Sequence, residues 1–262
     1  MASNTHYALV TGASSGMGLE FARQLAARGY NLLIVSNEEA IRTRAEEIKG
    51  ESRESIEIVP IVMDLGRQSS ARELYEYTRA HGLEIEVLVN NAGVYHDRDI
   101  LDDSEVFTEL IMNLHMHTPA MLCYLFGQEM RARGKGYILN VCSVTSQMAA
   151  QRLGTYGGTK AFLSHFTRAL HIELKPYGVY VTNVSPGAVD TGLYSISPTL
   201  TKIGKVLGII VSPQTLARRG LRALFHGRSK VTIPYVFWRV LTAIILCIPT
   251  CVLRLIRRLG WF

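Results

Sequence analysis

The sequence predicts an α/β protein built on one doubly wound parallel sheet of about seven strands, with helices on both faces. Short apolar runs alternate with longer helical patterns along the chain. Several of these runs, such as LLIV at 32–35 and VLVN at 87–90, are almost wholly apolar, as expected for strands that helices cover on both faces. The length of 262 residues suits a single domain of this class.

The elements follow from this alternation, because helices fill the intervals between the strands. Right-handed crossovers then place the carboxyl ends of the strands along one edge of the sheet, where ligands bind such sheets. We expect strands at 6–11, 31–36, 56–62, 86–90, 136–142, 179–184 and 231–233. We expect helices at 16–28, 38–49, 67–81, 103–133, 155–176 and 213–226.

Composition excludes several classes of protein. With 48% apolar and 19% charged residues, 22 Gly and 8 Pro, the chain is not disordered, collagen-like or a coiled coil. Four cysteines, Cys123, Cys142, Cys247 and Cys251, are too few for a disulfide framework at this length and lack zinc-finger spacing. The N-terminus has no basic region and no apolar stretch ahead of the first strand, so it does not resemble a secretory signal. We therefore expect a reduced, cytoplasmic location.

The charges are distributed unevenly. Residues 1–190 hold all 22 acidic residues and 17 basic ones, whereas residues 191–262 hold 11 basic residues and no acidic one. A cationic end on an otherwise acidic protein indicates an anionic surface or ligand. The candidates are phospholipid, acyl-CoA and nucleic acid.

A glycine-rich turn, TGASSGMG at 11–18, follows the first expected strand and opens the first expected helix. Glycines permit a tight turn and a close backbone approach, and the helix N-terminus offers N–H groups and a positive dipole end to a pyrophosphate. A turn needed only for packing is the alternative, and the context favours binding. The residues expected to hold a dinucleotide here are Gly12, Ser14, Ser15, Gly16, Met17 and Gly18.

Six further motifs follow in order. They are Asp64-Leu65, NNAG at 90–93, Asn113, Ser143, the spacing Tyr156-x3-Lys160, and Pro186-Gly187-x3-Thr191. With the glycine turn, this series resembles the short-chain dehydrogenase/reductase family in its compact subtype of about 250 residues, over residues 6 to about 192. The resemblance implies a Rossmann-like catalytic domain, here 1–233 with a substrate loop and lid region at 188–226, and a homo-oligomer, either dimer or tetramer.

The spacing of Tyr156 and Lys160 suits proton transfer. A free phenol has a pKa near ~10, and a nearby ammonium lowers it by about 1–3 units. At i and i+4 the two side chains share one face of a helix, so Tyr156 can protonate a ketone oxygen while a nicotinamide delivers hydride to the carbon. The resemblance implies that Lys160 also holds the nicotinamide ribose. Outside this context the pair would be an ordinary half-exposed helical pair.

The resemblance adds Ser143 and Asn113 to the expected catalytic set. Ser143 would orient the substrate oxygen, with a turn-capping serine as the alternative. Asn113 lies in an apolar run where an unpaired amide is costly to bury. It would help to hold a water that links the lysine to solvent, with a satisfied core amide as the alternative. His115 and His117 do not share a helix face, so we interpret them as packing or surface residues, and we expect no metal.

The resemblance also assigns the rest of the dinucleotide site. Asp64, Leu65, Asn91, Ala92 and Gly93 match family positions around the adenosine; Asn90 belongs with them or serves the central sheet. Pro186 and Gly187 follow the sixth strand, and Thr191 matches the contact to the carboxamide. An acidic residue at position 36 would favour NAD, but this chain has Ser36 and Asn37. We therefore favour NADP(H), with NAD(H) as the alternative and Glu38 as an opposing charge.

Two segments bear on the substrate and its location. Residues 188–211 are rich in Leu, Ile, Tyr and Val, which suits a lipophilic carbonyl substrate or simply closes the core. The extension at 234–262 contains 14 uncharged residues between Arg239 and Arg254, or about 21 Å of helix, too short for a hydrocarbon core of ~30 Å. Its arginine and aromatic flanks suit an anchor on an anionic membrane surface, with a subunit interface as the alternative.

Together these features predict an NAD(P)H-dependent oxidoreductase that reduces a ketone to a secondary alcohol, or runs the reverse reaction. The expected substrates are lipophilic, such as a 3-oxoacyl chain, a 3-keto sphingoid base or a steroid. A catalytically silent dinucleotide sensor or scaffold is the alternative, but such a protein typically lacks one of the four expected catalytic residues. Nucleic acid is not an expected partner, because the basic residues of the tail flank an apolar stretch. We expect the enzyme in the cytoplasm, peripheral to a membrane.

Overall fold

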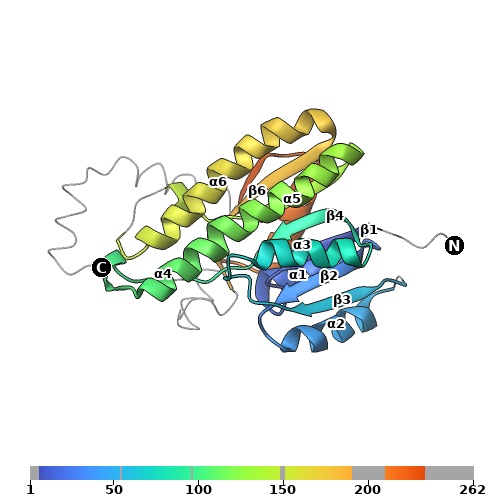
Figure 1. Ribbon diagram of the computed structural model, residues 1–262, viewed down its shortest axis with the longest axis horizontal. Helices are drawn as coiled ribbons and strands as arrows, with labels where there is room; N and C mark the ends of the chain where they lie inside the picture. The colour runs from blue at the N-terminus through green and yellow to red at the C-terminus, as the bar shows by residue number, and fades with distance from the viewer. Residues whose placement is uncertain (1–5, 54, 96, 148–150, 191–209, 234–262) are drawn as a thin grey trace.

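The computed structural model describes residues 6–53, 55–95, 97–147, 151–190 and 210–233. Seven parallel strands form one sheet in the order β3-β2-β1-β4-β5-β6-β9 (Figure 1). The fold class predicted from the sequence is therefore confirmed. The strands are β1 (His6–Thr11), β2 (Asn31–Ser36), β3 (Ile58–Val62), β4 (Glu84–Asn90), β5 (Gly136–Val141), β6 (Val179–Pro186) and β9 (Lys230–Ile233).

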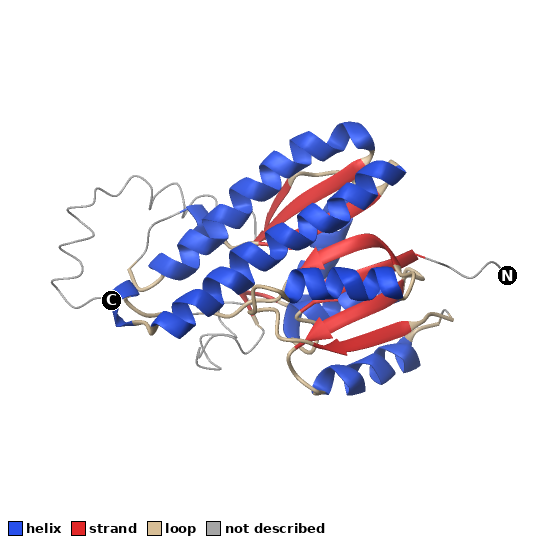
Figure 2. Cartoon of the chain, in the orientation of Figure 1, coloured by secondary structure: helices blue, strands red, loops and turns tan. Residues whose placement is uncertain are grey.

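Helices cover both faces of the sheet, as Figure 2 shows. One apolar core lies between the sheet and α1 (Gly16–Ala26), α2 (Ala40–Glu51) and α8 (Pro213–Phe225). A second lies on the opposite face, beneath α3 (Ser70–Ala80), α5 (Thr118–Arg133) and α6 (Gly154–Leu174). The central strands β1, β2, β4, β5 and β6 are almost wholly buried between these layers, which explains their continuous apolar runs.

The long helix expected at 103–133 is interrupted. A 3₁₀ turn, η1 (Ile100–Asp102), precedes α4 (Glu105–Met112), and the Ser104 hydroxyl caps α4 by accepting a hydrogen bond from the Phe107 N–H at 3.2 Å. A π-helical turn, η2 (Asn113–His117), then joins α4 to α5. The Thr118 N–H bonds to the Asn113 carbonyl five residues back, so the π turn adds one residue to the helical repeat.

The remaining expected elements are present with shifted ends. β4 begins two residues before the expected start, and β3 two residues after it. The helix expected to end at 176 closes as a 3₁₀ turn, η4 (Lys175–Tyr177), and another, η3 (Val144–Gln147), follows β5. Two strands were not expected, β7 (Ala188–Val189) and β8 (Ile210–Val211), which pair in parallel.

The strand order reverses between β1 and β4, because β2 and β3 lie on one side of this pair and β5, β6 and β9 on the other. Beyond the carboxyl ends of strands at such a switch point, doubly wound sheets bind their ligands. The glycine turn follows β1 and the NNAG motif follows β4, so the two motifs are neighbours here.

Some predictions fall on residues outside those that the structure describes. They are the contact from Thr191, most of the substrate loop, and the extension at 234–262. Within the described residues, no helix is both long and apolar enough to cross a membrane.

Candidate active site

Two positions of the glycine turn leave no room for a side chain. Gly12 has a positive φ of 65°, and a Cβ added to it would lie 2.8 Å from the Cα of Ala92. A Cβ on Gly18 would overlap the Gly12 carbonyl oxygen. The backbone can pass this close to the loop after β4 only because both positions lack a side chain.

The NNAG loop is bonded to the end of β1. The Thr11 hydroxyl accepts hydrogen bonds from the backbone N–H groups of Asn91 and Ala92, at 2.9 and 3.0 Å. The Asn91 amide nitrogen donates to the carbonyls of Thr11 and Gly12, at 3.0 and 3.1 Å. These bonds fix the two motifs relative to each other at the switch point.

The end of β2 lies beside the glycine turn and carries no acidic side chain. The Ser36 hydroxyl donates to that of Ser14 at 3.0 Å and accepts from the Glu38 N–H at 3.2 Å. Arg44, on the second turn of α2, donates from Nε to the Ser14 carbonyl at 3.2 Å. Its Nη1 bonds to both carboxylate oxygens of Glu47. Asn37 and Ser15 are exposed at the same corner.

The other residues expected around the adenosine lie at neighbouring strand ends. Asp64 follows β3, and its Oδ1 accepts a hydrogen bond from the Gly66 N–H at 2.8 Å. Leu65 is buried beneath it. Asn90 is also buried, and its amide donates to Asn140 Oδ1 on β5 at 2.8 Å. The nearby sheet thus holds the Asn90 side chain, whereas its neighbour Asn91 lines the main hollow of the site.

That hollow opens to solvent at the carboxyl edge of the sheet. It brings together the glycine turn, the loop after β4, the end of β5, the start of α6 and the turn after β6. The residues that line it are Met17, Asn91, Gly93, Val94, Val141, Cys142, Ser143, Tyr156, Lys160, Pro186, Gly187 and Val189. Three of the four expected catalytic residues therefore meet in one place.

Tyr156 and Lys160 share one face of α6 and are 7% and 5% exposed. The Lys160 Nζ lies 5.9 Å from the centre of the Tyr156 ring and donates to the Val141 carbonyl at 3.1 Å. Burial lowers the pKa of Lys160 to about 8, so the amine remains mainly protonated at neutral pH. The ammonium thus lies near the Tyr156 ring.

Ser143 is buried where β5 runs into η3. Its hydroxyl oxygen accepts two hydrogen bonds from Thr145, from the side-chain hydroxyl at 2.8 Å and from the backbone N–H at 3.2 Å. The hydroxyl hydrogen of Ser143 remains available for a further acceptor. Thr145, two residues further along the chain, thus orients this hydroxyl.

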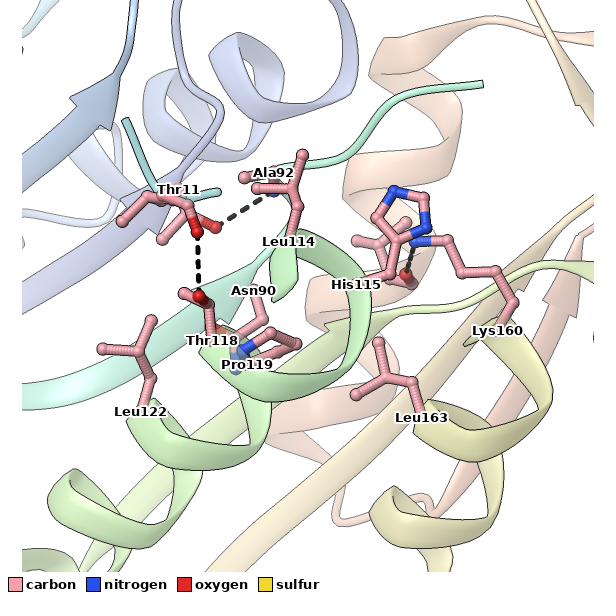
Figure 3. A pocket seen from close by; sticks show the side chains of 12 residues that line it. Thr11, Asn90, Ala92, Leu114, His115, Thr118, Pro119, Leu122, Lys160 and Leu163 are labelled. Carbon is pink, nitrogen blue, oxygen red and sulfur yellow. Dashed lines mark hydrogen bonds between the residues drawn. The ribbon is translucent and has the colours of Figure 1, made fainter. Parts of the chain in front are cut away.

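Asn113 lies outside the main hollow, whereas His115 is buried next to the catalytic pair. Asn113 is the half-exposed first residue of the π turn and does not line the main hollow. His115 is 1% exposed and lies edge-on to the Tyr156 ring, with 5.7 Å between ring centres. It also lines a smaller hollow with Lys160, Asn90, Thr11 and Thr118 (Figure 3). The sequence placed His115 among packing residues and missed its proximity to the catalytic pair.

The geometry fits a dinucleotide. The N-terminus of α1 has no side-chain cap and no acidic residue in its first turn, so its N–H groups and positive dipole end can meet a pyrophosphate. Among the described residues, the buried Oδ1 of Asn91 has no hydrogen-bond partner. An orphaned acceptor of this kind is suited to a ligand donor. No group of three metal-binding side chains is present within the same residues.

Comparisons with known proteins agree with this geometry. The family model for short chain dehydrogenases matches residues 6–198. The very-long-chain 3-oxoacyl-CoA reductase of Pyrenophora tritici-repentis is 31% identical over 238 residues, 87% of this chain and 67% of that protein. The reductase of the same name from Anas platyrhynchos is 30% identical over 241 residues, 88% of this chain and 73% of that protein.

Solved structures share the fold. A short-chain dehydrogenase from Sphingobium yanoikuyae in complex with NADPH has a TM-score of 0.77 at 24% identity, covering 93% of this chain and 96% of that one. The bulky-bulky ketone specific alcohol dehydrogenase from Comamonas testosteroni has a TM-score of 0.77 at 26% identity, covering 94% and 96%. The chain belongs to the short-chain dehydrogenase family and is an oxidoreductase that uses a nicotinamide dinucleotide.

Proposed function

We propose that this enzyme reduces the 3-oxo group of a long acyl thioester to a secondary alcohol, with NADPH as the reductant. The observation that carries the proposal is the larger hollow at the switch point, where Ser143, Tyr156 and Lys160 meet the loops that follow β1 and β4. The names of the related reductases support the acyl substrate. The apolar composition of residues 188–211 supports a lipophilic chain.

The cofactor supplies a hydride to the carbonyl carbon, and the protein supplies the proton. Tyr156 donates its phenolic proton to the ketone oxygen as the carbon–oxygen double bond becomes a single bond. The Lys160 ammonium stabilises the phenolate that remains, because it lies 5.9 Å from the ring centre in a buried site. In this proposal Asn113 holds a water through which Lys160 and Tyr156 regain a proton from solvent.

Ser143 holds the substrate oxygen in place. Because Thr145 donates both of its hydrogen bonds to the Ser143 oxygen, the Ser143 proton points to an acceptor other than Thr145. A ketone oxygen in the hollow accepts this proton and that of Tyr156, and its developing negative charge strengthens both bonds.

We assign the preference for NADPH to the corner formed by Ser14, Ser36 and Arg44. An acidic residue at the end of β2 would repel the extra phosphate, and Ser36 removes that repulsion. The Arg44 guanidinium, which also pairs with Glu47, is bonded to the Ser14 carbonyl and places N–H donors at the same corner. Ser15 and Asn37 are exposed beside it and can donate hydrogen bonds.

The direct test is a steady-state comparison of long-chain 3-oxoacyl-CoA with a 3-keto sphingoid base and a steroid ketone, each with NADPH and with NADH. We expect the acyl-CoA and NADPH to give the largest kcat/KM. Replacing Tyr156 with Phe should lower turnover by about 10³-fold while the dissociation constant of NADPH changes little. Faster reduction of another substrate would overturn the acyl assignment, and unchanged turnover of Y156F would remove Tyr156 from the reaction.

We further propose that residues 234–262 hold the enzyme at the cytoplasmic face of an anionic membrane. The segment has an apolar stretch flanked by arginines and carries no acidic residue, which supports an interfacial anchor. The full chain should sediment with vesicles that contain phosphatidylserine, and a chain that ends at Ile233 should not. Equal sedimentation of the two chains would refute the anchor.

We propose a homo-oligomer that uses the outer surfaces of α5 and α6. These helices pack side by side and expose large apolar side chains. Exposed apolar patches of this kind often mark protein–protein interfaces. Tyr124 on α5 is 55% exposed, and Phe162 and Ile172 on α6 are 39% and 73% exposed. Light scattering should give a dimer or tetramer that I172E disrupts; a monomeric parent chain would contradict the proposal.

A further inference from the structure

The imidazole of His115 uses both of its nitrogens. Nε2 accepts a hydrogen bond from the Val94 backbone N–H at 3.0 Å, and Nδ1 lies 3.1 Å from the Thr159 hydroxyl oxygen. That hydroxyl donates to the Tyr156 carbonyl at 2.8 Å, so it accepts from His115. Since an amide N–H can only donate, Nε2 carries the lone pair and Nδ1 carries the hydrogen. The contacts therefore select one neutral tautomer.

These bonds connect two parts of the active site. Gly93 and Val94 line the hollow that we assign to the nicotinamide and the substrate, and Tyr156 and Lys160 line it from α6. A Cβ added to Gly93 would lie 2.8 Å from His115 Nε2 and 3.6 Å from Lys160 Nζ. Figure 3 shows the His115 ring beside the end of the Lys160 side chain. The imidazole thus lies where the loop after β4, the ammonium and the first turns of α6 meet.

The surroundings keep the ring uncharged. Burial, and after it the charge of Lys160, holds the pKa of His115 well below its usual value. A protonated ring would direct an Nε2–H at the Val94 N–H and lose that hydrogen bond. A second cation would also repel the Lys160 ammonium.

We propose that His115 is a positioning residue, whose neutral imidazole ties the Gly93–Val94 segment to the turn of α6 that carries Tyr156 and Lys160. The inference deepens the proposed function, because it concerns the same hollow. His115 sets the distance between the backbone that borders the nicotinamide and the proton donor. Both ring nitrogens are already bonded, so His115 itself transfers no proton during the reaction.

Three substitutions separate the two hydrogen bonds. His115→Phe keeps a planar ring and removes both bonds. His115→Gln keeps an acceptor near the Nε2 position, and His115→Asn keeps a donor near the Nδ1 position. His117→Phe is the matched control, since His117 lies on the same π turn, half-exposed, and its Nε2 bonds to the Gln68 carbonyl away from the site.

We expect H115F to lower kcat by about 10- to 100-fold, because small displacements of reacting groups are costly. KM for the carbonyl and the NADPH dissociation constant should change by less than about 3-fold, because most of the residues expected to hold the cofactor lie elsewhere. H115Q should recover most of the loss, and H117F should match the parent enzyme. A kcat for H115F within about 2-fold of the parent, per folded molecule, would overturn the proposal, as would equal kcat values for H115Q and H115F.

Nuclear magnetic resonance of the ligand-free protein, labelled with ¹⁵N at its histidines, tests the geometry without any substrate. The His115 signals, identified by their absence in H115F, should show a protonated Nδ1 and an unprotonated Nε2 at neutral pH. An Nε2–H tautomer or a charged ring would overturn the inference. This measurement does not depend on the proposed acyl substrate. Failure of the His115 inference is therefore distinguishable from failure of the proposed function.

Discussion

The helices α1 and α6 both begin at the carboxyl edge of the sheet, yet the faces that they bury differ in polarity. α1 packs through apolar side chains such as Leu19, Phe21 and Leu25. It also lies against α8, where a Cβ on Gly220 would be 3.3 Å from the Phe21 ring. Contacts of this kind are strong but have no direction, so they hold a helix close without fixing its rotation closely.

The buried face of α6 is largely polar. Below Tyr156 and Lys160 it carries Ser164, Thr167 and His171 at helical spacing. Ser164 and Thr167 accept hydrogen bonds from Asn183 at 2.7 Å and Asn140 at 2.9 Å, and His171 Nδ1 lies 2.8 Å from the Val181 carbonyl. The asparagines stand in register across the sheet, Asn90 opposite Asn140 and Asn140 opposite Asn183.

The difference matches what each helix does. In the proposed function the α1 N-terminus would meet a pyrophosphate through several backbone N–H groups, which tolerate small shifts. α6 must aim one phenol at one oxygen, and directional bonds along its length fix both its rotation and its position along the axis. We therefore expect substitutions on the polar face of α6 to affect catalysis, and substitutions on the apolar face of α1 to affect mainly stability.

The largest expected effect comes from the apolar side. Phe21 is fully buried, so Phe21→Ala should lower the free energy of unfolding by about 3–5 kcal/mol. The kcat of the molecules that remain folded should stay within about 2-fold of the parent value, since α1 does not aim the proton donor. Urea unfolding and kcat normalised to folded protein check both parts. A Phe21→Leu variant serves as the control with a smaller cavity. A large loss of kcat in the folded Phe21→Ala variant would contradict the comparison of the two helices.

Features that depend on neighbouring residues in the chain could be predicted from the sequence. The glycine turn and the spacing of Tyr156 and Lys160 are local, so strand-to-helix order and helical periodicity suffice to place them. The strands were predictable for a similar reason, because their apolar runs reflect burial on both faces. The acid-free end of β2 was likewise visible in the residues themselves.

Features created by packing could not be predicted in the same way. The π turn at 113–117 depends on how α4 and α5 meet the rest of the fold, and β7 and β8 pair across 20 intervening residues. The contact between Arg44 and Ser14 also joins distant residues. His115 did leave a signal: it is polar within an apolar helical run, and burying such a group demands partners, as was argued for Asn113.

Lys160→Met tests whether the buried ammonium on the polar face of α6 lowers the stability of the fold. Burial lowers the pKa of Lys160 to about 8, against about 10.5 when unfolded, which costs about 3 kcal/mol at pH 7. After the loss of the Val141 hydrogen bond, the ligand-free variant should be more stable than the parent by about 1–3 kcal/mol at pH 7, and inactive.

The pH dependence of the free energy of unfolding tests the sign of this effect. Between pH 8 and pH 10.5 the unfolded chain binds more protons at Lys160 than the folded chain does, so the stability contributed by this residue rises with pH. The advantage of K160M should therefore shrink between pH 7 and pH 9.5, which urea unfolding at the two values measures. A variant less stable than the parent at pH 7 would show that the buried ammonium does not destabilise the fold.

Thr167→Val tests the polar attachment farther from the site, with the smallest expected effect. Valine has the shape of threonine but no acceptor, so the Asn140 amide loses its 2.9 Å bond and remains buried. The free energy of unfolding should fall by about 1–2 kcal/mol. Because α6 loses one of the bonds that fix its rotation, kcat should also fall by about 3- to 10-fold, unlike in the Phe21 variant.

Thr167→Ser keeps the hydroxyl and should retain the parent kcat. If T167V loses stability but keeps the parent kcat, the polar face of α6 supports the fold without aiming Tyr156.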